Sequence, residues 1–279
     1  MKIETLVNTN IVTAAGAKRH LQLFVLFLAL SVFLIGNKAY SQIPRVTESN
    51  TIAWFQLNTE LQFNKKWGLH IDLNSRRVDF VQDNMQTLFR TGLNFRPSEK
   101  ILLRAGIANA HNTPYGTYPI NKYGKPFDEI RLFQMVGLAD KIGPVELNHR
   151  FMLEQRWLEK YSKPELDKPD GYTYLNRLRY LLRLQMPFKK NAKQQKYPYL
   201  TMYDEVMICF GNEVNANIFD QNRFAILAGF RFNSVARIEA GYLNQILQLP
   251  RRVDNNNVIQ YNNGLQVNLL LTISTKNSK

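Results

Sequence analysis

The sequence is poor in the residues that build disulfides and metal sites. It has a single cysteine, Cys209, and four histidines among 279 residues. One thiol cannot form a disulfide within the chain, so burial and backbone pairing have to stabilise the fold. The histidines, the cysteine and the carboxylates show no ligand-like spacing, and the sequence contains no glycine-rich phosphate loop. We therefore expect neither a metal ion nor another cofactor.

Long apolar runs are also scarce, and the most apolar stretch lies near the start of the chain. A basic cluster, Lys18-Arg19-His20, precedes the mostly apolar residues Leu21–Ile35, and Ala39-Tyr40-Ser41 follows. This order is typical of a secretory signal peptide with its cleavage site. The apolar run is shorter than the about 20 residues of a spanning helix, although an uncleaved anchor is the alternative. We predict a signal peptide at residues 1–41 and one exported domain at residues 42–279.

The chain is strongly basic, with 36 lysines and arginines against 22 aspartates and glutamates. Such a balance raises nucleic acid as a partner. The basic residues do not gather in one stripe, however, and an exported protein does not meet nucleic acid, so we exclude this partner. The partners that the charge favours are outer-membrane lipid, through its anionic head groups, and small anionic solutes.

After residue 42, apolar and polar residues alternate with a period of two. In residues 54–63, Phe55 and Leu57 face one way while Gln56 and Asn58 face the other. This alternation predicts strands with one apolar and one polar face. We count eleven such strands of about ten to fifteen residues, with no convincing helix and no linker.

The lengths of the strands and loops favour a membrane barrel over a soluble β-sandwich. Strands of soluble proteins average about five or six residues, whereas a tilted spanning strand needs roughly nine to eleven. Short turns alternate with long loops, of which Pro250–Val258 is the last. We predict an all-β, closed, antiparallel up-and-down transmembrane β-barrel. Because such barrels have even strand numbers, we expect twelve strands, and ten as the next count. The extra strand would lie within Ile43–Ser49 or come from a split of another segment.

Aromatic residues near the predicted strand ends fit the girdles that mark the two membrane interfaces. The residues of this group are Trp54, Trp67, Trp157, Tyr161, Tyr172, Tyr174, Tyr197 and Tyr199.

Charged residues on the polar faces are the remaining candidates for function, and in a barrel they would point into the lumen. They are Glu60, Arg90, Arg104, Glu129, Arg131, Arg150, Glu154, Arg156, Arg177, Arg179, Arg183, Glu205, Arg231, Arg237 and Glu239. One interpretation is a plug of mutually neutralising pairs. The other is an anion-selective lining, since arginine outnumbers glutamate, with Arg177, Arg179 and Arg183 as its best candidates.

A lipid-modifying enzyme would need a serine activated by a histidine. Ser75 and His70 are the closest such pair in the sequence. Their offset of five residues places them on opposite faces of a regular strand, so we do not expect catalysis by them.

Several segments resemble the DUF2490 family of uncharacterised exported bacterial proteins. They are the first strand pair with Trp54, the strand with Arg90, Glu154-Gln155-Arg156, Tyr174–Leu184 and Tyr203-Asp204-Glu205. The resemblance implies an outer-membrane barrel and brings no established activity. We therefore expect a monomeric, non-enzymatic outer-membrane protein, either structural or a narrow solute conduit. The alternatives are an outer-membrane lipid-modifying enzyme and a soluble periplasmic β-sandwich that binds ligands.

Overall fold

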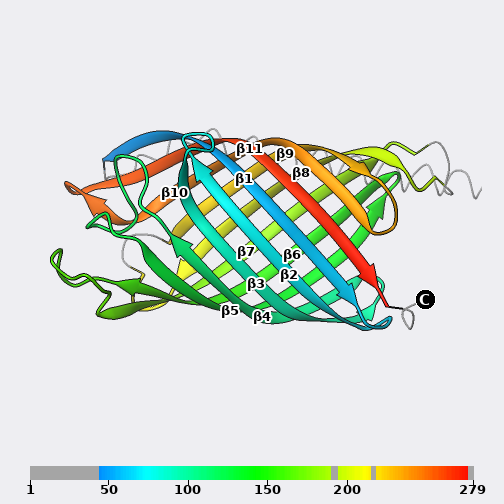
Figure 1. Cartoon of the computed structure of the whole chain (residues 1–279), viewed down its shortest axis with the longest axis horizontal. Helices are drawn as coiled ribbons and strands as arrows, with labels where there is room; N and C mark the ends of the chain where they lie inside the picture. The colour runs from blue at the N-terminus through cyan, green and yellow to red at the C-terminus, as the bar shows by residue number, and fades with distance from the viewer. Residues whose placement is uncertain (1–43, 190–193, 215–217, 276–279) are drawn as a thin grey trace, which may run out of the picture. The chain divides into compact units, whose positions relative to one another are not determined.

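The computed structural model describes residues 44–189, 194–214 and 218–275, and the predicted signal peptide lies outside them. In these residues, eleven strands form one closed barrel (Figure 1). The strands are β1 (Arg45–Gln62), β2 (Trp67–Val78), β3 (Asp83–Ser98), β4 (Ile101–Asn112), β5 (Phe127–Ile142), β6 (Val145–Lys160), β7 (Gly171–Pro187), β8 (Tyr197–Phe210), β9 (Phe219–Arg231), β10 (Ala236–Val253) and β11 (Asn256–Ser274). The all-β closed barrel is confirmed, and a β-sandwich is excluded. No helix in the described part of the chain is long and apolar enough to cross a bilayer.

The barrel closes through a parallel pair, which explains its odd number of strands. Neighbours in sequence pair antiparallel, but β1 pairs with β11 in parallel, from Arg45 opposite Asn257 to Gln62 opposite Ser274. The described strands therefore number eleven instead of the expected twelve. The segment expected to form an extra strand is the start of β1 from Arg45 onward, while Ile43 lies outside the described residues. A parallel closing pair lets the first and last strands run in the same direction, so no further strand is needed.

The closing pair is tightly packed at one glycine. A Cβ atom on Gly264 of β11 would lie 1.7 Å from the backbone oxygen of Ile52 in β1. No side chain can occupy that space, so glycine is required for β1 and β11 to approach each other here.

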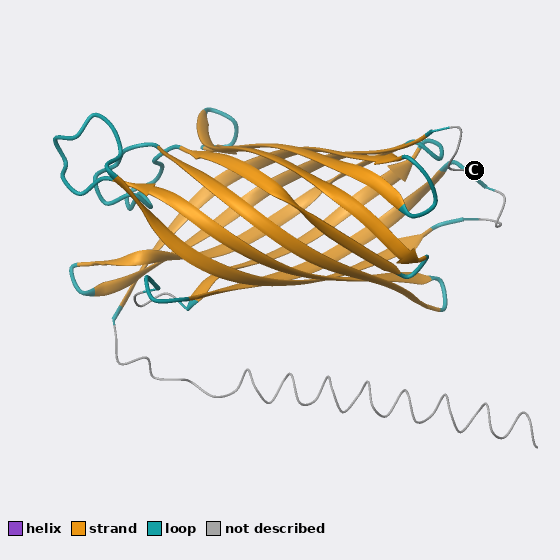
Figure 2. Ribbon diagram, turned by 90° about the horizontal axis from the view of Figure 1, so that it is seen from below, coloured by secondary structure: helices purple, strands orange, loops and turns teal. Residues whose placement is uncertain are grey.

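Most short connections lie at one end of the barrel and the longest loops at the other, as the sequence predicts (Figure 2). We call the end with residues 63–66, 99–100 and 143–144 the turn end, and the end with residues 113–126 and 161–170 the loop end. The short link 79–82 at the loop end and the longer link 188–196 at the turn end depart from this rule. The predicted long loop Pro250–Val258 is also an exception. There β10 and β11 continue to a two-residue turn, Asp254-Asn255, in which both residues have positive φ. Aspartate and asparagine tolerate this conformation, so the chain reverses without a long loop.

The two faces of the strands differ sharply in chemistry. In β8, buried and exposed residues alternate along the whole strand from Tyr197 to Phe210, with Glu205 buried inside and Val206 exposed outside. Every strand presents at least one exposed large apolar side chain on the outer face of the barrel. Examples in strand order are Phe55, Leu73, Phe89, Ile107, Leu132, Phe151, Leu178, Val206, Ile226, Ile238 and Leu269.

Outer aromatic side chains occupy both ends of the barrel. At the turn end, Trp67 contacts Phe95 with ring centroids 4.7 Å apart. At the loop end, Trp157 contacts Tyr174 at 5.2 Å, and Tyr172 is exposed beside them.

Other members of the predicted girdles do not lie on the outer face. Trp54, Tyr197 and Tyr199 are buried inside, and Tyr161 follows β6 and lines a cavity at the loop end. Trp54 lies inside because its neighbour Phe55 faces outward, and successive residues of a strand alternate.

Candidate functional site

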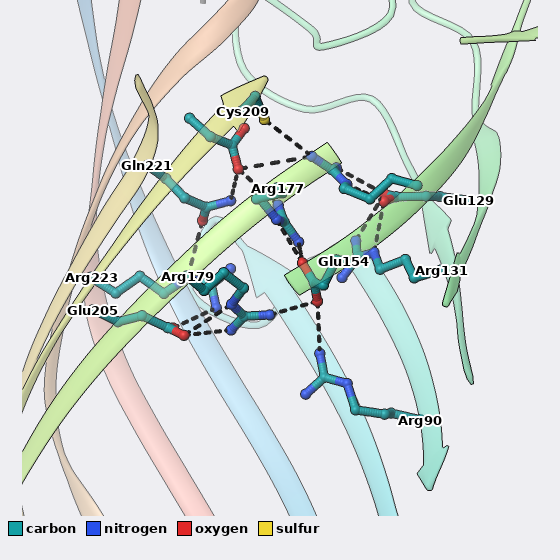
Figure 3. A network of polar contacts seen from close by, with 12 residues as sticks. Arg90, Glu129, Arg131, Glu154, Arg177, Arg179, Glu205, Cys209, Gln221 and Arg223 are labelled. Atoms are coloured by element: carbon teal, nitrogen blue, oxygen red, sulfur yellow. Dashed lines mark hydrogen bonds and ion pairs between the residues drawn. The ribbon is translucent and has the colours of Figure 1, made fainter. Parts of the chain in front are cut away.

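The centre of the barrel is organised around one carboxylate. Glu154 of β6 has no solvent exposure. Its Oε2 atom accepts from Arg177 of β7, at 2.7 Å from Nε and 2.5 Å from Nη2, and its Oε1 atom accepts from Arg179 at 2.9 Å. Arg90 of β3 approaches Oε1 at 3.8 Å from across the interior. Figure 3 shows these three arginines directed at the single glutamate, which neutralises part of their charge.

A second carboxylate, Glu205 of β8, continues the network. Its Oε1 accepts from Arg179 at 2.7 Å and from Arg150 at 2.7 Å, while Arg223 lies 3.6 Å from Oε2. Arg179 therefore bridges Glu154 and Glu205. Removing either glutamate or Arg179 would therefore leave a buried ion with less opposite charge around it.

Glu129 and Asp220 complete the network near the loop end. Both Oε atoms of Glu129 accept from Arg131 and from Arg156, in two bidentate pairs. Asp220 accepts from Arg177 Nη1 at 2.7 Å, and Arg156 lies 3.9 Å from it. A register shift between β8 and β9 turns Asp220 inward next to Gln221. This irregularity adds a carboxylate that strict alternation would have placed outside.

Two smaller clusters lie toward the turn end. Glu60 binds His70 at 2.9 Å and Arg104 at 2.5 Å. Glu239 binds Arg183 and accepts from the hydroxyl of Tyr199 at 3.0 Å. In these clusters, as in the central network, carboxylates neutralise buried basic side chains, here near the turn end.

The predicted lumen-facing residues are thus largely brought together. Ion pairs of 4 Å or less involve Glu60, Arg90, Arg104, Glu129, Arg131, Arg150, Glu154, Arg156, Arg177, Arg179, Arg183, Glu205 and Glu239. The other two, Arg231 and Arg237, are register partners at the turn end, where Arg231 donates to the backbone oxygen of Asn233. They lie outside the central network.

The list of predicted charges omits several buried ones: Asp72, Arg76, Asp220 and Arg223. Asp72 and Arg76 share a face with His70 in the alternating pattern of β2, so the sequence could have indicated them. Arg223 likewise follows the alternation of β9. Asp220 lies in a segment predicted as loop, and its inward position depends on the register shift.

Apolar side chains fill the rest of the middle of the barrel. One cluster includes Ile52, Trp54, Leu227 and Leu243 and extends toward the loop end through Met85 and Tyr115. A smaller apolar cluster contains Phe133 and Met152. The guanidinium of Arg90 lies 5.5 Å from the centroid of the Phe133 ring. Side chains of both kinds are buried at mid-height, so this part of the described interior is packed with protein atoms.

The loop end, in contrast, contains a cavity of about 550 Å³. The β4–β5 loop folds over one side of it. In that loop Tyr115 is buried, and its hydroxyl donates to Gln260 of β11 at 2.8 Å. Burial raises the pKa of the Tyr115 phenol, which keeps it a neutral donor. Arg251 donates to Pro119 of the same loop, which fixes the loop to β10.

The described interior does not bring metal-ligating or catalytic side chains together. In the residues that the structure describes, no group of three or more His, Cys, Asp or Glu side chains could hold a metal ion. His70 is buried inside against Glu60, whereas Ser75 alternates with the inward Asn74 and Arg76 and so faces outward. This serine and histidine therefore do not form a pair.

The sequence matches one known protein-family model over most of its length. DUF2490, described as a protein of unknown function, matches residues 51–257, which is more than half of the chain. The chain belongs to the DUF2490 family. The match begins within β1 and ends at the second residue of β11, so it includes most of β1 and all of β2 to β10. No curated protein sequence matches the chain.

Proposed function

We propose that this DUF2490 protein is an integral β-barrel of the bacterial outer membrane that is exported by its N-terminal signal peptide. The observation that carries the proposal is the apolar outer face, to which every strand contributes at least one exposed large apolar side chain. Soluble monomers rarely expose contiguous apolar patches larger than a few hundred Å². An apolar band around a closed barrel with a polar interior is the pattern of outer-membrane proteins.

Further features support a position in the bilayer. The shortest strands have 12 residues, which exceeds the roughly nine to eleven needed to span the hydrocarbon core. Aromatic pairs such as Trp67–Phe95 and Trp157–Tyr174 lie at opposite ends of the outer face, where interfacial girdles are found. The described strands close on themselves, so no unpaired edge faces lipid, which supports a monomer.

The interior supports a structural, non-enzymatic role with a closed lumen. Arg177 and Arg179 share Glu154, and Arg183 binds Glu239, so the three best candidates for an anion path are already neutralised. A narrow anion conduit is the second candidate. It is favoured by the cavity at the loop end, whose lining contains eight lysines and arginines but four aspartates and glutamates. A conduit would require the central network to open.

The membrane proposal is tested with the intact protein. Cell membranes are washed with alkaline carbonate, and the purified barrel is run on gels with and without boiling. We expect the protein to stay in the membrane pellet and to migrate differently before and after boiling. Release by the wash, with no shift on heating, would refute the proposal.

The conduit is tested separately in planar bilayers. The closed interior predicts no steady current from the wild-type barrel. A stable anion-selective current would favour the second candidate over the structural role.

A further inference from the structure

The cavity at the loop end contains a buried cation without a counter-ion. Arg76 of β2 lines the cavity and is 8% exposed. In the described residues no carboxylate lies within 4 Å of its guanidinium, and its Nε atom has no hydrogen-bond partner. Its Nη1 atom donates to Gln86 at 2.6 Å. A buried charge without an opposite charge is costly, so this position is suited to an anion from outside the chain.

The other buried arginines of the cavity differ from Arg76 because each has a carboxylate, whereas Arg251 is partly exposed and donates to the backbone oxygen of Pro119. Arg131 and Arg156 bind Glu129, and Arg177 binds Asp220. Arg223 reaches Glu205 more loosely, at 3.6 Å. Among the buried arginines of the cavity, Arg76 is therefore the one without a carboxylate in the described residues.

A second cation strengthens the positive potential around Arg76. The guanidinium carbons of Arg76 and Arg223 lie 4.1 Å and 4.8 Å from the centroid of the Trp54 ring. Two cations share one indole, whose own N–H is buried without a partner. The repulsion between these cations would fall if an anion bound beside them.

The remaining lining indicates what kind of anion fits. Met85, Tyr115, Phe127 and Leu247 give part of the cavity an apolar wall. Glu129 and Asp220 also line it and would repel a dianion such as phosphate. A volume of about 550 Å³ lies within the range of pockets for small organic ligands.

We propose that this cavity binds a small organic monocarboxylate with an apolar body, held through its carboxylate by Arg76. Arginine suits this task because its planar fork of donors matches a carboxylate. The inference depends on the barrel interior and not on residence in a membrane or on passage of solutes. It can therefore fail while the proposed function stands.

The test uses Trp54 as the reporter, because it contacts Arg76. The other two tryptophans of the chain, Trp67 and Trp157, lie on the outer face and are replaced by phenylalanine. The folded barrel in detergent is titrated with phenylacetate while Trp54 emission is recorded. We expect a saturable change, and no saturable change with the neutral phenylacetamide. Absence of saturation with phenylacetate, or an equal response to phenylacetamide, would overturn the proposal.

Variants then locate the site. Arg76→Gln should raise the apparent Kd for phenylacetate by about tenfold or more, since it removes a charged hydrogen-bond donor. Arg76→Lys keeps the charge and should recover part of the affinity. The matched control is Arg231→Gln, which removes an arginine at the turn end. Folding of each variant is checked by the gel shift on boiling, and equal affinity of folded Arg76→Gln and wild type would also overturn the proposal.

Discussion

Glu154 and Arg177 form an ion pair at the centre of the barrel, with the Oε2 atom of Glu154 2.5 Å from Nη2 and 2.7 Å from Nε of Arg177. They come from the adjacent strands β6 and β7 and are direct register partners. The pairing is thus set by the strand register, and the same glutamate holds Arg179, two residues further along β7.

Replacing Glu154 with glutamine should destabilise the barrel strongly. Arg177 and Arg179 would keep their charges but lose a shared carboxylate, and breaking a buried ion pair costs about 3–5 kcal/mol. The free energy of unfolding is measured by urea titration of the barrel in detergent. Glu146→Gln at the partly exposed turn end is the control and should change it by less than about 1 kcal/mol. Equal effects of the two substitutions would show that the network does not stabilise the fold.

Removing the network should open the interior. The triple variant Glu154→Ala, Arg177→Ala, Arg179→Ala deletes three bulky side chains. Each ion that loses a partner keeps another: Asp220 keeps Arg156, Glu205 keeps Arg150 and Arg90 keeps Asp72. We expect measurable conductance in planar bilayers from this variant and none from the wild type. A folded triple variant that remains silent would mean that the apolar cluster around Trp54 closes the lumen by itself.

The alternating faces could be predicted from sequence because the strand pleat is local. Once Leu178 is assigned to the outer face, its neighbours Arg177 and Arg179 must point inward. The same rule applied to Phe55 places Trp54 inside. The prediction that Trp54 belongs to an outer aromatic girdle was wrong, because it considered only how close Trp54 lies to a predicted strand end.

Closure and register shifts could not be predicted in this way. The partner of β1 is β11, some 200 residues away, and their parallel pairing depends on the geometry of the whole barrel. Asp220 enters the network only because the β8–β9 register shifts by one residue between Met207 and Ile208. Arg76 also precedes a register shift, and its lack of a carboxylate depends on side chains of other strands.

A charged side chain on the outer face should destabilise the barrel in a bilayer by an amount that depends on its depth in the bilayer. Leu178 lies at the middle of β7 and is exposed on the outer face. If the barrel spans the outer membrane, Leu178→Arg should lower its stability in bilayers by about 2–4 kcal/mol, and a residue near an interface by about 0–1 kcal/mol. Asn109→Arg, near the loop end of β4, is the matched control. Unfolding from lipid vesicles gives both values, and equal losses would contradict the expected depth dependence.

The closing strand pair should be sensitive to the smallest added side chain. Gly264→Ala would place a Cβ atom 1.7 Å from the Ile52 oxygen, so β1 and β11 would have to separate locally. Overpacking of this kind costs about 1–3 kcal/mol. Gly137→Ala is the control, because its nearest neighbour would be 3.5 Å away. Hydrogen exchange at β1 amides should rise in Gly264→Ala alone, and unchanged protection there would show that the pair adapts without opening.

The β6–β7 loop should loosen in acid. Asp170 accepts hydrogen bonds from the hydroxyl and the backbone N–H of Ser162, the latter at 2.8 Å, and these bonds lower the pKa of the Asp170 carboxyl. A lowered pKa means that the contact stabilises the loop fully above the ordinary aspartate value of about 3.9, and is lost as pH falls through the lowered value. Protection of the Ser162 amide, corrected for intrinsic exchange, should therefore persist at pH 5 and decline below the pKa of Asp170. Asp170→Asn, which cannot ionise, should show no such decline over the same range, and an identical decline in both proteins would assign the transition to another group.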